Sequence, residues 1–198
     1  MSIDSTDAVR RHLLRLADGS RTAADEIAGQ AVRYAELIRE TLLAGGKILY
    51  AGNGGSAAAA EHIATEYVVR LKRERRALPA LALTANTAQL SAAANDYGFE
   101  RVFARVLEAH ARPGDLLVLH STSGNSTNLL EVARVAREIP LRTVALLDRR
   151  GGKLAPLVDL AIRLPADDSA AVQELQLAVE HSVAELVEGW LVGDAEDG

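Results

Sequence analysis

The sequence predicts an α/β fold with a mainly parallel sheet, and three observations support this prediction. Five short apolar runs, at 47–51, 79–83, 115–119, 142–147 and 159–164, alternate with segments of helical periodicity. Several runs lack polar alternation, as expected of strands that are covered on both faces. Apolar residues make up 48% of the chain but aromatic residues only 4%, so Ala, Val and Leu must build the core. Strands that alternate with helices are typical of an α/β domain.

Helices are expected at both ends of the chain. Residues 5–18 have the pattern of a short amphipathic helix. A longer helix is expected over about 22–43, and Gly45-Gly46 is a suitable stop for it. The last helix is expected over 169–192, because apolar residues recur there along one stripe.

Length and composition limit the class of protein. The chain of 198 residues suffices for a single domain, divided into N-terminal helices (about 1–45), an α/β core (46–168) and a C-terminal helix (169–192). The net charge of −5 disfavours a nucleic-acid partner. The chain has no cysteine, which excludes disulfides and thiolate metal sites. The first residues lack a stretch of signal-peptide or membrane-span length, so we expect a cytoplasmic protein with no membrane partner.

Two polar turns directly follow two of the expected strands. Gly52-Asn53-Gly54-Gly55-Ser56 follows the run at 47–51, and Ser121-Thr122-Ser123-Gly124-Asn125-Ser126 follows the run at 115–119. Parallel sheets bind ligands beyond the carboxyl ends of their strands, and hydroxyls at a helix N-terminus bind phosphate. Helix capping would explain either turn alone, but two equivalent turns favour a ligand. Neither turn matches a nucleotide-binding pattern, so we expect a small phosphorylated molecule and no nucleotide cofactor.

His62 and Glu66 stand four residues apart on the helix expected after the first turn. Side chains at this spacing are neighbours, so the pair can chelate a divalent metal, or one member can act as a base. A solvated surface pair is the alternative. Arg70 follows at the same spacing and is expected to point into the same cleft.

Two further polar segments have open interpretations. In the segment 93–99, Asn95 and Asp96 are suited either to bonding sugar hydroxyls or to forming a turn or helix cap. The basic run at 70–76 lacks interleaved aromatic residues and lies in an acidic chain. Apart from Arg70, its cations are expected to form a solvated loop, namely Lys72, Arg73, Arg75 and Arg76.

Together, these motifs resemble the SIS (sugar isomerase) domain family. The stretches GNGGSAAAAEH, ANDYGF, STSGNS, GGKLA and VQEL…H occur in the family's order and spacing, over residues 20–192. The resemblance implies a three-layer αβα sandwich with a five-stranded parallel sheet, and a homotetramer. Within the family, it implies conversion of sedoheptulose 7-phosphate to D-glycero-D-manno-heptose 7-phosphate, the first step towards nucleotide-activated heptose.

The resemblance also implies the site residues of this chain. The phosphate contacts fall on Ser56, Ser121, Thr122, Ser123 and Ser126. The sugar contacts fall on Asn53, Gly54, Gly55, Asn95 and Asp96, with Arg70, Glu66 and Gln173 also at the substrate. The metal ligands, for zinc where a metal is seen, fall on His62, Glu66, Gln173 and His181, and the catalytic base and acid on Glu66 and His181.

Three positions depart from the family pattern and leave alternatives open. Ala59 stands where an acidic or amide residue is usual, Ala171 where an arginine is usual, and Gln176 where a histidine is usual. An isomerase for another ketose phosphate is therefore one alternative. The other is a non-catalytic SIS adaptor, of the kind that binds the bacterial replication initiator. Such adaptors lack the equivalents of Glu66 and His181, and both are present here, which favours an enzyme.

Aldose–ketose isomerisation moves a proton between C2 and C1 through an enediol, which requires a base and an acid. Glu66 is assigned to the carbon-bound proton and His181 to the protons on oxygen, while a metal would polarise the carbonyl. A metal-bound carboxylate is a poorer base, so either the metal binds loosely or Glu66 changes partner. Gln173 and His181 are ~12 Å apart along one helix and ~80° apart around it, so we expect two subunits to share each active site.

Overall fold

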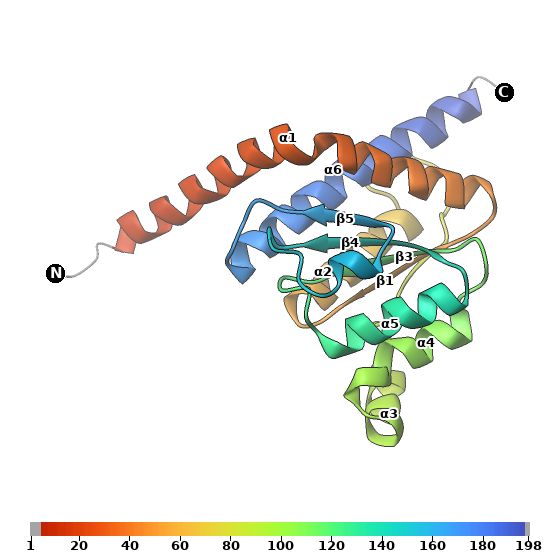
Figure 1. The fold of residues 1–198 in the computed structure, drawn as a ribbon. Coiled ribbons are helices and arrows are strands. Elements are labelled where there is room, and N and C mark those ends of the chain that lie inside the picture. The colour runs from red at the N-terminus through yellow and green to blue at the C-terminus, as the bar shows by residue number, and fades with distance from the viewer. Residues whose placement is uncertain (1–4, 197–198) are drawn as a thin grey trace.

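A computed structural model describes residues 5–196 of the chain (Figure 1). Its five strands form one sheet in the order β2-β1-β3-β4-β5, and every neighbouring pair is parallel. The strands are β1 (Ile48–Gly52), β2 (Ala80–Ala82), β3 (Leu116–His120), β4 (Arg142–Leu147) and β5 (Leu160–Arg163). The predicted α/β fold with a five-stranded parallel sheet is confirmed.

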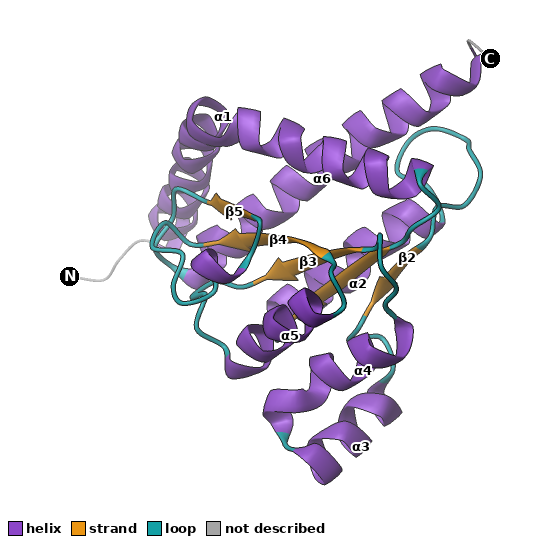
Figure 2. Cartoon of the chain, turned by 45° about the vertical axis from the view of Figure 1, so that its right-hand side comes forward, coloured by secondary structure: helices purple, strands orange, loops and turns teal. Residues whose placement is uncertain are grey.

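Helices cover both faces of this sheet, as Figure 2 shows. One face carries α1 (Ser5–Leu43), α2 (Gly55–Val68) and α6 (Ser169–Glu196), and the other carries α3 (Thr87–Tyr97), α4 (Val102–His110) and α5 (Thr127–Glu138). Short 3₁₀ turns lie at Phe99–Arg101 and Ala155–Leu157. In β1, Tyr50 packs in the core under α1, α2 and α6, while Leu49 packs in the core under α4 and α5. Both faces are buried, which is why the strand sequences show no polar alternation.

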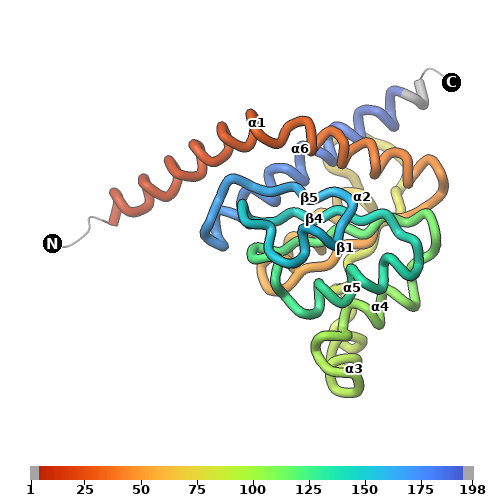
Figure 3. Tube along the Cα trace, in the orientation of Figure 1, coloured from red at the N-terminus to blue at the C-terminus, as the bar shows by residue number. Residues whose placement is uncertain are grey.

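The N-terminal region is one helix of 39 residues, so the predicted break after residue 18 is wrong. Gly19 and Ser20 are weak helix formers, but they lie where α1 packs on α6, and a Cβ on Gly19 would contact Leu175 at 3.6 Å. The Ser20 hydroxyl donates to the carbonyl of Leu16 at 2.8 Å and bonds back to the preceding turn. Packing therefore overrides local propensity, and the first part of α1 continues past the sheet as an arm (Figure 3).

The long helices raise the question of a membrane span. Within residues 5–196, the long helices, α1 and α6 included, are too polar for any window of them to pass through a bilayer.

The strand order reverses between β1 and β3. The register pairs Gly52 with His120, so these two strands end side by side. Open parallel sheets bind ligands in the crevice at such a reversal. The topology therefore brings together the two polar turns that follow β1 and β3.

Candidate active site

The first turn folds tightly between β1 and α2. A Cβ on Gly52 would lie 2.5 Å from the carbonyl oxygen of Ser56, so only glycine fits at this position. Gly54 has a φ of 56° and precedes α2, which has no side-chain cap. The Ser56 hydroxyl is buried and lies 3.4 Å from Oε1 of Gln176 on α6. Ser56 thus lies on the buried side of the turn, against α6.

The second turn is shaped by its own serines. Ser121 Oγ accepts a hydrogen bond from the backbone N–H of Gly124 at 3.0 Å, and Ser123 Oγ accepts from that of Asn125 at 3.3 Å. Ser126 occupies the N-cap position of α5, but its hydroxyl makes no cap bond. The capping alternative therefore does not account for Ser126, and its hydroxyl is available to a ligand.

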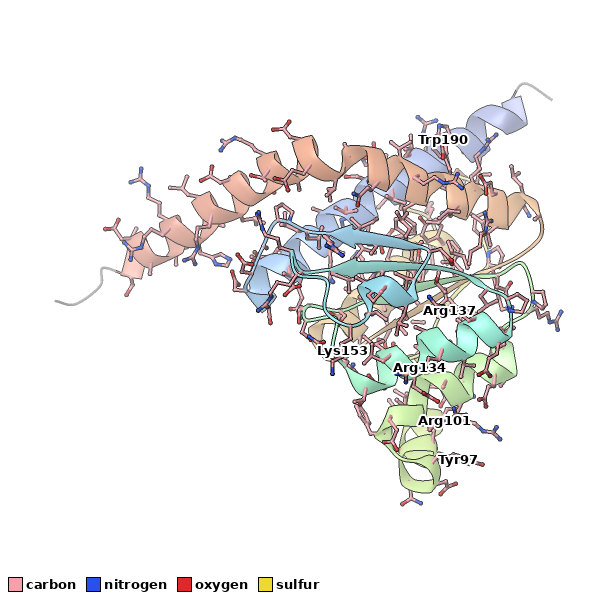
Figure 4. The ribbon with its side chains drawn as sticks, in the orientation of Figure 1. Tyr97, Arg101, Arg134, Arg137, Lys153 and Trp190 are labelled. Carbon is pink, nitrogen blue, oxygen red and sulfur yellow. The ribbon has the colours of Figure 1, made fainter. Side chains whose placement is uncertain are left out.

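The loop after β4 supports the second turn from behind. A Cβ on Gly124 would lie 2.3 Å from the carbonyl oxygen of Gly151, so the two loops are in backbone contact. The backbone N–H of Lys153, a residue labelled in Figure 4, donates to Asn125 Oδ1 at 3.2 Å. This contact explains the GGKLA motif structurally, because it holds the serine turn in place.

A pair of amides joins the two turns across the crevice. Asn53 Nδ2 donates to Asn128 Oδ1 and Asn128 Nδ2 donates to Asn53 Oδ1, each at 2.9 Å. Asn128 is buried at the start of α5. Sequence reasoning missed Asn128; its signal is a polar residue inside the apolar stripe of that helix.

His62, Glu66 and His181 form one cluster within a single chain. His62 Nε2 lies 2.9 Å from His181 Nε2 and 3.4 Å from Glu66 Oε1. One ligand atom from each residue lies within 4.8 Å of the others, a separation that suits a shared ion. The side chain of His62 is 46% exposed and that of Glu66 is 19% exposed, so the cluster is accessible to solvent.

Gln173 takes a different position from the other three expected ligands. Its amide lies over Gly55, where a Cβ would be 2.7 Å from Gln173 Oε1. Gly55 is seven residues before His62 on α2, a rise of about 10 Å. An open hollow of about 400 Å³ lies between α2 and α6, and both His62 and Gln173 line it, together with Ala58, Ala59 and Ala170. Sharing of this centre between subunits stays a prediction, since one chain already gathers His62, Glu66 and His181.

A buried polar network lies behind the cluster. His120 Nε2 lies 2.6 Å from Glu180 Oε1, and the hydroxyl of Tyr34 donates to the same carboxylate at 3.0 Å. Burial, together with the negative charge of Glu180, raises the pKa of Tyr34 well above its ordinary value. His120 and Glu180 directly precede Ser121 and His181, yet sequence reasoning did not pair them because 60 residues separate them.

The remaining candidates lie elsewhere in the chain. Helix α2 ends at Val68, so the expectation that Arg70 lies one helical turn after Glu66 is wrong; Arg70 Nε lies 3.6 Å from Glu74. Asn95 and Asp96 are exposed in the last turn of α3, where Asn95 Nδ2 donates to Asp96 Oδ1 at 2.8 Å. Helix α3 lies outside α4, in the layer opposite α6 (Figures 1 and 2). Their sugar contacts therefore stay predictions.

The expectation of a wholly solvated loop at 70–76 is wrong for Arg75. Its side chain is 6% exposed and lies 3.2 Å from the carboxylate of Glu188 on α6. A run of charges indicates a solvated segment only on average. The partner that buries Arg75 comes from a helix more than 100 residues later in the chain.

Comparison with known proteins reveals extensive similarity. Residues 14–148 match the family model described as SIS domain. A phosphoheptose isomerase of Akkermansia muciniphila is 45% identical over 188 residues, covering 95% of this chain and 99% of that one. A phosphoheptose isomerase of Geobacter sulfurreducens is 48% identical over 163 residues, covering 82% and 86%. The solved structure of a phosphoheptose isomerase from Neisseria gonorrhoeae superposes with a TM-score of 0.88 at 35% identity, covering 94% of this chain and 100% of that chain.

Proposed function

Because the chain belongs to the SIS-domain family, and within it to the phosphoheptose isomerases, we propose that it converts sedoheptulose 7-phosphate to D-glycero-D-manno-heptose 7-phosphate, with Glu66 and His181 as its catalytic residues. One observation carries the assignment of these roles. The carboxylate of Glu66 on α2 and the imidazole of His181 on α6 meet at His62, and α2 begins in the turn after β1, beside the end of β3.

The phosphate group is assigned to the second turn. Ser126 has a hydroxyl without a cap bond at the N-terminus of α5, and Ser123 is exposed beside it. The N-terminus of a helix favours an anion through its dipole and its backbone N–H groups. Thr122 and Ser121 complete the proposed cradle, Ser56 approaches from the first turn, and Gln173 approaches from α6 over Gly55.

The proton transfer follows from the two side chains. Glu66 takes the proton from C1 of the ketose, which gives the enediol, and returns a proton to C2 to give the aldose. His181 moves a proton from O1 to O2, so that the carbonyl passes from C2 to C1 and the charges balance. Each role contributes ~10²–10⁴-fold to the rate.

The cluster suits zinc in its donor set and in its spacing. Zinc binds imidazole nitrogen and carboxylate oxygen at ~2.0 Å, and two such ligands in a tetrahedral site lie ~3.3 Å apart. The two separations from His62 Nε2, 2.9 Å to His181 and 3.4 Å to Glu66, bracket that value, and the ligand atoms of all three residues lie within 4.8 Å of one another. We assign His62, Glu66 and His181 of one chain as ligands, and Gln173 of a second copy of the chain as the fourth, as the proposed sharing of sites requires. A bound zinc would act as a Lewis acid on the substrate carbonyl.

A cytoplasmic homotetramer with shared sites is also part of the proposal. The arm of α1 exposes Val9, Leu13 and Leu14 at 54–62%. A groove of about 420 Å³ between α1 and α6 is lined mainly by apolar side chains, such as Ala24, Ala28 and Leu186. Monomeric proteins rarely expose large contiguous apolar patches to solvent. The exposed apolar side chains of the arm and the apolar groove therefore support packing of α1 and α6 against further copies of the chain.

The direct test is an isomerase assay on purified protein with a panel of ketose phosphates, with the Glu66→Gln variant as the blank. Turnover of sedoheptulose 7-phosphate that is lost in the variant supports the proposal. Preferred turnover of another ketose phosphate would keep the mechanism and replace the substrate, in line with the departures at Ala59, Ala171 and Gln176. No turnover of any sugar phosphate, together with capture of a replication initiator, would favour the adaptor function.

A further inference from the structure

The loop after α2 is fastened to α6 by the buried pair of Arg75 and Glu188, and we propose that Arg75 is a positioning residue for Glu66. Arg75 does not reach the crevice, and the isomerase mechanism as described does not use it. The inference rests on the role of base proposed for Glu66. It adds a residue outside the active site on which the geometry of proton abstraction depends.

The guanidinium of Arg75 binds the end of α2. Its two terminal nitrogens donate to the carbonyl oxygen of Glu66 at 2.6 Å and to that of Tyr67 at 2.9 Å. The last four carbonyls of a helix have no partner within the helix, and this turn frays unless something binds them. Glu66 lies in that last turn, since α2 ends at Val68. Arg75 therefore fixes the peptide from which the side chain of Glu66 projects.

Glu188 holds Arg75 in place from α6. Its carboxylate accepts hydrogen bonds from the backbone N–H groups of Leu71, Lys72 and Arg73, at 3.2, 2.9 and 2.8 Å. Burial alone would raise the pKa of Glu188, but these three donors and the charge of Arg75 outweigh burial and lower it. The carboxylate therefore stays ionised, and the loop is closed around it.

The same contact sets the spacing between base and acid. Glu188 follows His181 by seven residues on α6, which is two helical turns and places both on one face. Near the C-terminal end of α2, two polar contacts thus join it to α6, His62 with His181 and the end of α2 with Glu188 through Arg75. Loss of the second point frees the turn that carries Glu66 to shift relative to His181. A displacement of ~1 Å costs ~10²-fold in rate, so the effect falls on kcat.

Arg75→Lys is the informative variant. A lysine keeps the positive charge beside Glu188, but its ammonium is a compact charge and cannot reproduce the planar fork that reaches two carbonyls. Arg76→Lys is the matched control, because Arg76 is the next residue of the same loop and is exposed. We expect kcat of Arg75→Lys to fall by ~10-fold or more with KM changed less than ~3-fold, and Arg76→Lys to match wild type.

Hydrogen exchange gives the second measurement. The amides of Val69 and Leu78 bond to the carbonyls of Thr65 and Tyr67 at the end of α2, and their exchange should quicken in Arg75→Lys only. Equal kcat in the two lysine variants, while wild type is active, would overturn the inference and leave the proposed function standing. A fall in kcat without faster exchange at Val69 would overturn it as well. If Arg75→Lys does not fold, Glu188→Gln replaces it, since its amide oxygen still accepts from the loop, and the same two readouts decide.

Discussion

The Nε2 atoms of His62 and His181 lie 2.9 Å apart, although 119 residues separate the two in the chain. The rings meet edge to face, with centroids 5.1 Å apart. At this distance, one nitrogen donates to the other, or both face a common cation. The contact joins α2 to α6 beside Glu66, and the first two predictions test the roles of these three residues.

Removal of His62 should weaken zinc binding. Even the loss of a residue that only orients a metal ligand lowers affinity ~10–100-fold, so loss of a ligand in His62→Ala should cost at least ~10-fold. Competition with a chromophoric chelator measures the dissociation constant. His110→Ala is the control, since His110 is exposed at the end of α4. Equal zinc affinity in the two variants would exclude His62 as a ligand.

Glu66→Gln and His181→Gln should each lower kcat by ~10²–10⁴-fold, because neither amide carries a proton as the native group does. KM should change little, since the serine turns are untouched. Steady-state kinetics on the ketose phosphate measures both constants. A kcat near that of wild type in either variant would remove that residue from the mechanism.

The serines of the second turn should separate into two roles. Ser123→Ala with Ser126→Ala removes two hydroxyls proposed to bind phosphate, and hydrogen bonds to a charged group contribute ~1.5–3 kcal/mol each, so KM should rise by at least ~10-fold. Tm should hold, because the Ser126 hydroxyl makes no cap bond and the N–H of Asn125, which loses Ser123 Oγ, is exposed and can bond to water instead. Ser121→Ala should lower Tm as well, since it leaves the N–H of Gly124 without its partner. Unchanged KM in the folded double variant would refute the phosphate cradle.

Gly124→Ala should loosen the serine turn more than a left-handed φ alone explains. Gly45 and Gly124 both have positive φ, at 81° and 64°, but only Gly124 faces a backbone atom at 2.3 Å from an added Cβ. Strain from φ costs ~1–3 kcal/mol in each variant. The Gly124→Ala protein should therefore unfold at lower urea than Gly45→Ala and show a higher KM. Equal urea midpoints for the two variants would mean that moving the loop of Gly124 away from the loop of Gly151 does not lower the stability of the protein.

Glu188 should make stability depend on pH in the acid range. Its folded pKa lies below the unfolded value of 4.5, so the carboxylate stabilises the fold at every pH above 4.5. This contribution is lost as the pH falls through the folded pKa, where the unfolded chain binds the extra proton more readily. Urea unfolding of wild type and Glu188→Gln should therefore differ at pH 7 and converge in acid. Arg75 and Tyr67 are the groups that face this carboxylate, and a constant difference across pH would assign the effect to packing.

The sheet and its two turns were predictable because their signals are local. The run at 115–119 is apolar throughout from Leu116 to Leu119, so it does not have the pattern of an amphipathic surface helix, and the polar turn follows it directly in the sequence. Local rules failed where a distant partner decides the outcome. Gly19 and Ser20 are weak helix formers, yet α1 continues through them because α6 packs on that part of it.

The details of the site depended on pairing between segments far apart in the chain. Nothing near Arg75 in the sequence indicates that it is buried, because Glu188 lies on the last helix. The spacing of Gln173 and His181 correctly separates them along α6, but it does not show that α2 runs alongside and meets both residues. Helical geometry fixes distances within an element and leaves open which other element lies beside it.

The reciprocal amide bonds between Asn53 and Asn128 have a kinetic consequence. Each side chain supplies a hydrogen-bond donor and an acceptor to the other, so the two turns hold their shape without a substrate. Binding sites that must first reorganise associate slowly and lose affinity to ordering. Here a sugar phosphate should meet a rigid crevice, with an association rate that is independent of which sugar follows the phosphate. The enzyme should then discriminate between sugar phosphates through their dissociation rates.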